Sequence, residues 1–278
     1  MRAIRHMRNI QIDVTNLCDG PKCSNCTRML AHHRRRFIMS FENFKIAVRS
    51  LAEFPGVVGV FGGNPCMIGQ FEAYSRWFAR ARAGKRRRGI WTNNYGPHAT
   101  LCREIYGTHN YNPHRSECYH CPTMVAIKDV VADARTMWEL IDRCPINLTW
   151  SACITEINGQ PRAYFCEIAA AWDHVYREDN GLPVVDGWWE WDLSRFDRQI
   201  RRWCPNCGMA CPLPARRDID RVDDVSDTHL PVVAAGRSVE RFDPAGYDLA
   251  EQRRRWRHPL DYLLLRSDKR RRNLRKSP

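Results

Sequence analysis

The chain has 278 residues, a formal net charge of +13 and 13 cysteines. This length allows one large domain, or a core domain of about 200 residues with an appendage. The basic N-terminus is not followed by an apolar stretch of signal-peptide length, and no run approaches the roughly 20 apolar residues of a membrane span. We therefore expect a cytoplasmic protein with no membrane partner, whose cysteines are metal ligands or buried thiols rather than disulfides.

The positive charge is concentrated at the C-terminal end. Residues 251–278 contain 11 Lys and Arg against 3 Asp and Glu, which gives this segment a net charge of +8. Blocks of like charge suit polyanions, because each neutralised phosphate releases counterions, but such blocks are also commonly disordered whatever they bind. The tail is therefore either a binding segment for a polyanion such as nucleic acid or a solvated extension that only aids solubility.

Strand and helix patterns alternate over the first hundred residues. The alternating residues 9–17 predict a strand, and Ser40 can cap the helix that follows. The apolar run 57–61 predicts a buried strand, residues 71–81 predict an amphipathic helix, and residues 89–92 predict a third strand. This order favours an α/β fold with a parallel sheet and right-handed crossovers, which places ligand sites at the carboxyl ends of the strands.

The pattern is weaker after the third strand. Residues 125–131 and 146–154 are typical of strands, and apolar positions from Ala134 to Ile141 lie on one helix face. Beyond residue 150 the chain is rich in Cys, Trp and Pro. We therefore predict three regions: a core domain over residues 1–150, a Cys-rich region over 151–215, and a C-terminal extension with the basic tail over 216–278.

Three cysteines, Cys18, Cys23 and Cys26, lie in one loop directly after the first predicted strand. Thiolates packed this closely in a reducing compartment indicate metal ligands, because a disulfide framework needs an oxidising one. One interpretation is half of a zinc site completed by His32 or His33, since Cys and His at such spacings fit tetrahedral zinc.

The loop after the second predicted strand, Gly62-Gly63-Asn64-Pro65, favours another interpretation. A three-cysteine loop followed by this segment resembles the radical SAM superfamily, where Cys-x3-Cys-x2-Cys follows the first barrel strand and Gly-Gly-Glu-Pro follows the second. The chain departs from that pattern twice, because Cys18 and Cys23 are one residue further apart and Asn64 replaces Glu. Thr92-Asn93, after the third strand, resembles the Thr-Asn-Gly often found there.

The resemblance implies a partial (β/α)6 TIM-type barrel in which Cys18, Cys23 and Cys26 hold a 4Fe–4S cluster. One iron is then left for S-adenosylmethionine (SAM), and reductive cleavage of SAM gives a 5′-deoxyadenosyl radical that abstracts hydrogen from a substrate. A reductase or a flavodoxin- or ferredoxin-type protein would supply the electron. The SAM contacts implied by the motifs are Gly62, Gly63, Asn64, Pro65, Thr92 and Asn93.

A second set of cysteines follows residue 150. Residues 153–166 predict a hairpin with a thiol on each flank, and Cys204 and Cys207 form a Cys-x2-Cys knuckle. The set resembles the SPASM or twitch extension of radical SAM enzymes. This resemblance implies an auxiliary 4Fe–4S cluster on Cys153, Cys166, Cys204 and Cys207, with Cys211 as a substitute. A zinc knuckle is the alternative, since four thiolates serve either metal.

The remaining cysteines and aromatic residues have simpler interpretations. We expect Cys118 and Cys121 to be buried or substrate-side thiols, and we expect core positions for Cys66, Cys102 and Cys144. The Trp188–Trp191 segment is either core or a base-stacking surface. Glu156 and Glu167 are candidate proton partners, and nothing in the sequence distinguishes between them.

The resemblance as a whole implies a hydrogen-abstracting radical SAM enzyme whose reaction class (isomerase, oxidoreductase or transferase) stays open. The basic tail favours a phosphate-bearing substrate, either a nucleotide or a base in nucleic acid. Two alternatives remain: a radical SAM maturase that modifies peptides or proteins, and a zinc-binding nucleic-acid module without catalysis.

Overall fold

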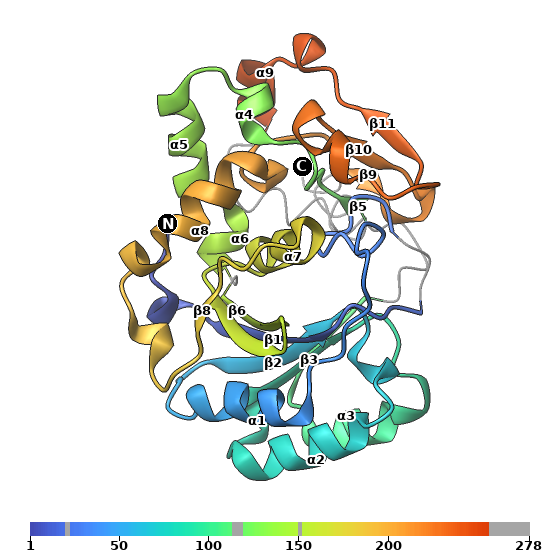
Figure 1. The fold of residues 1–278 in the computed structure, drawn as a ribbon, viewed down its shortest axis with the longest axis vertical. Helices are drawn as coiled ribbons and strands as arrows, with labels where there is room; N and C mark the ends of the chain where they lie inside the picture. Colours follow the sequence, from blue (N-terminus) through green and yellow to red (C-terminus); the bar gives the residue numbers. More distant parts are fainter. Residues whose placement is uncertain (20–22, 113–118, 150–151, 256–278) are drawn as a thin grey trace, which may run out of the picture.

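The computed structural model describes residues 1–19, 23–112, 119–149 and 152–255 (Figure 1). The tail from residue 256 and Cys118 lie outside these ranges. The main element is a seven-stranded sheet with the strand order β4-β3-β2-β1-β6-β7-β8. The predicted α/β class is confirmed, because helices pack on this mostly parallel sheet.

Strand β1 (Asn9–Thr15) lies at the centre of the sheet. It pairs in parallel with β2 (Val57–Gly62) on one side and with β6 (Cys153–Ile157) on the other. Strands β3 (Arg88–Thr92) and β4 (Thr108–Tyr111) extend the parallel run beyond β2. All but the first residue of β1 are buried, which is typical of a parallel strand covered on both faces.

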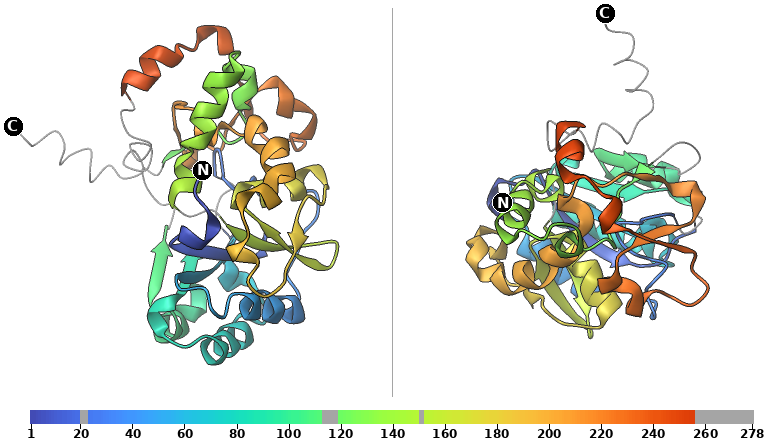
Figure 2. Two further views of the ribbon diagram at one scale, coloured as in Figure 1. Left: turned by 90° about the vertical axis from the view of Figure 1, so that its left-hand side faces the viewer. Right: turned by 90° about the horizontal axis from the view of Figure 1, so that it is seen from above.

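Helices α1 (Phe41–Ser50), α2 (Phe71–Ala81) and α3 (Ala99–Ile105) cover one face of the sheet (Figure 1). The predicted cap of α1 is confirmed, since the Ser40 hydroxyl accepts a hydrogen bond from the Asn43 amide at 3.2 Å. Helix α7 (Glu167–Tyr176) lies on the opposite face (Figure 1), and the left view of Figure 2 shows the molecule from the side. The sheet is therefore the middle layer between two sets of helices.

The chain after β4 differs from the prediction. Residues 127–130 and 145–149 form helices α4 (Ile127–Val130) and α6 (Pro145–Thr149) instead of strands. Pro145 suits the first turn of a helix, and Val125 and Ile127 pack in a small separate core with Leu213. The described sheet therefore has five parallel strands, in place of the six parallel units of the expected barrel.

The predicted hairpin over residues 153–166 is present and belongs to the main sheet. Strand β7 (Gln160–Tyr164) pairs antiparallel with β6, and β8 (Leu182–Pro183) pairs with β7. The turn between β6 and β7 has positive φ at Asn158 (51°) and Gly159 (75°), which suits these two residue types. The first strands of the Cys-rich region thus extend the sheet of the core.

The remaining elements form a layer beyond α7, at the top of Figure 1. Its helices are α5 (Ala134–Asp142), α8 (Asp197–Trp203) and α9 (Leu249–Arg255). Two small sheets complete it, one of β5 (Tyr119–His120) with β9 (Arg216–Arg217) and one of β10 (Asp223–Val225) with β11 (Val239–Arg241). Short 3-10 turns link the elements, notably η2 (Pro65–Met67), η7 (Cys204–Asn206) and η10 (Asp227–Val232).

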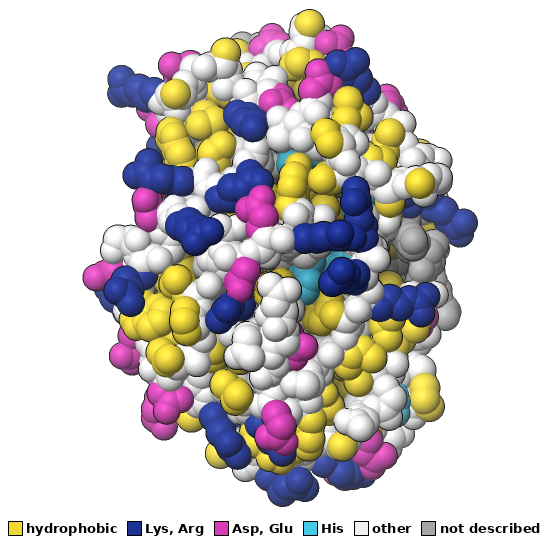
Figure 3. Space-filling view, viewed as in Figure 1, with side chains coloured by type: hydrophobic (Ala, Val, Ile, Leu, Met, Phe, Trp, Pro, Cys, Tyr) yellow, Lys and Arg dark blue, Asp and Glu magenta, His cyan; other side chains and the backbone are white. Residues whose placement is uncertain are grey.

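Basic and acidic side chains are interspersed over the face seen in Figure 3.

Across the described ranges, every helix is too short or too polar to cross a lipid bilayer.

Candidate metal and cofactor sites

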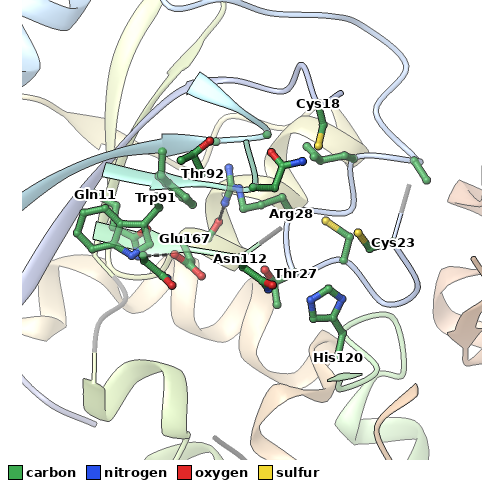
Figure 4. A pocket seen from close by; sticks show the side chains of 18 of the residues that line it. Gln11, Cys18, Cys23, Thr27, Arg28, Trp91, Thr92, Asn112, His120 and Glu167 are labelled. Atoms are coloured by element: carbon green, nitrogen blue, oxygen red, sulfur yellow. Dashed lines mark hydrogen bonds between the residues drawn. The ribbon is translucent and has the colours of Figure 1, made fainter. Parts of the chain in front are cut away.

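A cavity of about 180 Å³ lies where the loops after β1, β2 and β3 meet (Figure 4). Parallel strands bring their carboxyl ends to one edge of a sheet, so loops far apart in sequence become neighbours there. The structure therefore brings the three predicted motifs to one place. The predicted site residues that line the cavity are Cys18, Cys23, Cys26, Gly62, Gly63, Thr92 and Asn93.

Burial disfavours the thiolate form of two cysteines in this loop, Cys23 and Cys26. Burial raises the pKa of Cys23 well above its ordinary value, and the neighbouring Cys26 and Asp218 add to the effect. Burial also raises the pKa of Cys26 to about 11, although the backbone N–H groups of Leu30 and Arg28 oppose it. A metal bound here would displace these protons, because thiolates are the ligands.

Neither histidine proposed for a zinc site is free to be a ligand. The Nε2 of His32 bonds to the Asp223 carboxylate at 2.9 Å, and its Nδ1 accepts from the Ala234 amide at 3.1 Å. The two ring nitrogens of His33 bond to Asn16 at 3.0 Å and to the Arg28 carbonyl at 2.9 Å. Of the side chains considered for the zinc site, the three thiols are thus the ones left to bind a metal.

Gly62 and Gly63 let the second loop lie directly against the start of the cysteine loop. Gly62 has a φ of +147°, and a Cβ on it would lie 2.2 Å from the Thr15 carbonyl. A Cβ on Gly63 would lie 2.0 Å from the Leu17 carbonyl. Any larger residue would push the two loops apart, so both glycines are required by packing.

Asn64 supports the wall of the cavity and does not line it. Its carboxamide oxygen accepts from the Cys66 amide at 3.0 Å and from the Thr92 hydroxyl at 2.7 Å. Its nitrogen donates to the Asp19 carboxylate and to the Asn94 carbonyl, both at 2.9 Å. Pro65, which opens η2, is buried beside it. Of the six implied SAM contacts, the structure thus places four at the cavity.

Asn93 offers an acceptor to the cavity. Its nitrogen donates to Asp19 at 3.1 Å, while its Oδ1 is buried and has no hydrogen-bond partner in the described protein. A buried orphan oxygen costs free energy unless a bound donor satisfies it. This feature suits a ligand that carries an amine or hydroxyl group.

Three polar residues lie at the inner end of the cavity, Gln11, Arg28 and Glu167, and of these the sequence indicated only Glu167. The Gln11 carboxamide donates to the Glu167 carboxylate, and Arg28 donates to the Asp13 carboxylate and to the Glu167 carbonyl. Arg28 also lies over the Phe61 ring at 4.8 Å. Glu156 instead accepts hydrogen bonds at the start of α1, so only Glu167 of the two candidate acids reaches the cavity.

The C-terminal segment holds the cysteine loop in place, which the sequence did not indicate. Asp223 accepts from the Asn25 amide at 2.5 Å and from Arg237 Nε at 2.7 Å, in addition to its bond with His32. Arg237 also donates to the Cys23 carbonyl at 2.9 Å. The two partners are about 200 residues apart in sequence, so no local pattern could relate them.

A second cavity is lined by four cysteines: Cys144, Cys166, Cys204 and Cys207. Three of them belong to the expected ligand set. The fourth is Cys144, for which the sequence predicted only a core position. It comes directly before α6, at the point where the expected strand is a helix.

Cys153 and Cys211, both named in the expected ligand set, do not line this cavity. Cys153 is fully buried inside β6, in register with Gln11 and Tyr164. Cys211 packs in the small separate core, where its thiol lies 3.6 Å from the Tyr247 hydroxyl. The hairpin register thus keeps Cys153 within the sheet, while Cys166 follows the strand and begins α7.

The second cavity suits thiolate chemistry once protons are displaced. Burial raises the pKa of Cys166 and Cys204 well above the ordinary value and raises that of Cys207 to about 12. Cys166 is the N-cap of α7, where the helix dipole favours a thiolate.

Over the described residues, no three His, Cys, Asp or Glu side chains converge as on a single metal ion. The four thiols therefore share a cavity without meeting at one point.

The remaining candidates are core residues. Cys66, Cys102 and Cys121 are buried in the main core, as predicted for them. Trp188 and Trp189 are buried in the same core, so neither presents a surface for stacking a base.

Comparison with protein-family models and with curated proteins gives no match. Among solved structures, the chain is similar to the one described as the crystal structure of BtrN in complex with AdoMet and 2-DOIA. The similarity has 14% sequence identity and a TM-score of 0.44, and it covers 72% of this chain and 92% of the other. A sequence identity and a TM-score this low do not show to which family the chain belongs.

Proposed function

We propose that this chain is a radical SAM iron–sulfur enzyme. The observation that carries the proposal is the shared cavity of Cys18, Cys23 and Cys26 with Gly62, Gly63, Thr92 and Asn93. Three thiols from one loop, with His32 and His33 hydrogen-bonded to other groups, suit a 4Fe–4S cluster that keeps one iron for a small-molecule ligand. When bound, the cluster and SAM would supply the radical that abstracts hydrogen from a substrate carbon.

The protein's part is to bind and orient the cofactors and the substrate and to keep water away from them. Gly62 and Gly63 leave backbone rather than side chains at the wall, so a ligand can approach closely there. The orphan Oδ1 of Asn93 is an acceptor for a ligand amine or hydroxyl. At the inner end, Gln11 orients the Glu167 carboxylate, which can accept a proton from a substrate group.

The second cavity is proposed to hold an auxiliary 4Fe–4S cluster on Cys144, Cys166, Cys204 and Cys207. Four thiolates leave no position for an exchangeable ligand, which suits electron transfer or a structural role rather than SAM binding. A zinc ion on the same thiols is the alternative that metal analysis distinguishes.

A nucleotide or a base in nucleic acid is the substrate class that we favour. The basic segment after residue 250 suits phosphate, whereas the inner end of the cavity carries the Glu167 carboxylate. A base or sugar would therefore enter the cavity while the phosphates stay outside. A reductase or a flavodoxin- or ferredoxin-type protein would donate the electron. A peptide or protein substrate is the competing class.

Anaerobic purification tests the proposal directly. The protein should be brown, contain roughly four to eight irons, and release 5′-deoxyadenosine from SAM when reduced with dithionite. Replacing Cys18, Cys23 or Cys26 with Ala should abolish that release. Cys121→Ala is the matched control, because Cys121 is a buried thiol that lines neither cavity. Colourless protein that carries only stoichiometric zinc would overturn the proposal in favour of a zinc-binding module.

A further inference from the structure

Trp91 presents an aromatic ring to the cavity of the cysteine loop. It lies on β3, one residue before Thr92, and its half-buried side chain lines the cavity (Figure 4). Phe61 lines the same cavity, but it is only 6% exposed, and Arg28 lies over its ring at 4.8 Å. Of these two rings, the indole is therefore the one with surface open to a ligand.

Two glycines of the sheet make room for this indole. Gly59 on β2 and Gly89 on β3 are paired in register, and Gly89 lies on the same face of its strand as Trp91. A Cβ on Gly59 would lie 2.1 Å from the six-membered ring of Trp91, and one on Gly89 would lie 2.0 Å from it. Glycine inside a strand weakens the strand and often marks the close approach of another group. The indole thus lies directly on the sheet, at two positions where no side chain fits beneath it.

Carboxamide groups lie in register with the indole and with the glycine under it. Gln11 on β1 pairs with Gly59, and Asn110 on β4 pairs with Trp91. Both carboxamide side chains line the cavity, and Gln11 lies beside Trp91 at the inner end, where it donates to the Glu167 carboxylate (Figure 4). A carboxamide offers both a donor and an acceptor, which is the pattern that the edge of a nucleobase requires.

We propose that Trp91 stacks on the planar base of the substrate while the carboxamides of Gln11 and Asn110 bind the edge of that base. The inference rests on the proposed function, because it names the residue that holds the base in the cavity. An aromatic ring stacks on any base, since each base has a π-face, and hydrogen bonds to the base edge add a preference among bases. A neutral base also suits an end of the cavity that carries the Glu167 carboxylate, which would repel a phosphate.

The test measures the binding of the four ribonucleosides to the full-length, iron-loaded protein. Equilibrium dialysis is carried out anaerobically with saturating SAM and no reductant, so that SAM fills its own site and is not cleaved. We expect at least one nucleoside to bind. Trp91→Leu should raise the Kd of that nucleoside roughly 5- to 150-fold, the range that corresponds to the loss of one base–aromatic stack. Trp91→Phe should raise it less, because it keeps a ring.

Trp77→Leu is the matched control. Trp77 is also half-buried, but it lies on α2 and does not line the cavity. This variant should bind nucleosides as the wild type does, and all variants should bind SAM equally well. An unchanged nucleoside Kd in Trp91→Leu, or a loss of affinity for SAM alone, would overturn the inference and leave the proposed function standing. The same holds if the SAM-loaded wild type binds none of the four nucleosides.

A crosslinking experiment decides the question if Trp91→Leu does not fold. Ultraviolet irradiation of the wild-type protein with 5-iodouridine, again with SAM present, attaches the base to an aromatic ring stacked on it. An adduct found on Trp91 by mass spectrometry would support the inference, and its absence from Trp91 would overturn it. A wild-type protein that holds neither iron nor SAM would instead overturn the proposed function, and the inference with it.

Discussion

The Asn64 carboxamide donates to the Asp19 carboxylate at 2.9 Å and thereby joins the loop after β2 to the cysteine loop after β1. Asn93 and Asn94 donate to the same carboxylate at 3.1 Å and 2.9 Å, so three loops meet at one side chain. Burial acts to raise the pKa of Asp19, but the three side-chain hydrogen bonds outweigh it and hold this pKa below its ordinary value. An amide at position 64 is what this junction needs, because a carboxylate there would repel Asp19.

Asn64→Ala should destabilise the protein and weaken SAM binding together. The change removes the partner of the Cys66 amide, the Thr92 hydroxyl and Asp19, and leaving a buried polar group without its partner costs about 1–3 kcal/mol. We expect a lower midpoint in denaturant unfolding and a higher Kd for SAM in the iron-loaded protein, measured by equilibrium dialysis.

Asn43→Ala is the control for this prediction. Asn43 is a similarly buried asparagine whose carboxamide bonds to Glu156 and to the Gly159 carbonyl, and none of these three residues lines the cavity. It should lose stability to a comparable degree and keep its affinity for SAM. Equal affinities in both variants would contradict the role given to Asn64.

Asp223→Asn should destabilise the metal-free protein by about 3–5 kcal/mol near neutral pH, because it breaks a buried ion pair with Arg237. Burial raises the pKa of Asp223, but hydrogen bonds and charge from His32 and Arg237 outweigh it, so the net shift is downward. A lowered folded pKa gives stability that is present above the unfolded value of about 3.9 and is lost as the pH falls through the folded value.

The difference in unfolding free energy between wild type and Asp223→Asn should therefore shrink as the pH falls below about 4. Urea unfolding of the two proteins at several pH values measures it. Asp227→Asn is the control, because its pair with Arg241 is exposed and contributes little to stability. If the difference in unfolding free energy between the two proteins stays constant at pH values well below the ordinary pKa of an aspartate, the pKa of Asp223 does not change on folding.

If the second cavity holds the proposed cluster, Cys144→Ala should remove its iron, whereas Cys153→Ala should retain it. Of these two cysteines, Cys144 lines the cavity, whereas Cys153 lies within β6. Cys153→Ala leaves a space in the sheet and should cost stability without loss of iron. Iron analysis and Mössbauer spectra of both variants measure the outcome, and the reverse pattern would restore the ligand set expected from the sequence.

Deletion of residues 256–278 should weaken binding to single-stranded nucleic acid. The segment carries eight Lys and Arg against two Asp. For each phosphate that the shortened chain no longer neutralises, the slope of log K against log salt should fall in magnitude by roughly 0.7 for a single strand. Titrations by fluorescence anisotropy at several salt concentrations test this, and an unchanged affinity and slope would count against polyanion binding by the tail.

Replacement of Arg270, Arg271 and Arg272 by Ser separates charge from length in this experiment. This variant keeps all 278 residues and should have a smaller salt dependence than the wild type. If it binds as the wild type does and the deletion does not, the length of the tail rather than its charge is responsible.

Local patterns in the sequence determined the first half of the fold. Ser40 before an amphipathic run, the apolar run from Val57, and the Gly62-Gly63 turn each depend on neighbouring residues, and the structure has α1, β2 and the loop where they predict them. Because parallel strands align their carboxyl ends, the alternation of strands and helices also sufficed to predict that the three motif loops meet.

The tertiary structure alone decided which distant groups complete the sites. The sequence favoured Cys153 as a ligand and Cys144 as a core residue, whereas in the structure Cys144 precedes a helix and lines the second cavity, and Cys153 lies within β6. The bonds of Asp223 to the cysteine loop and the place of Glu167 at the cavity likewise join segments more than 100 residues apart. Such contacts depend on how whole elements pack, and no periodicity within a segment encodes them.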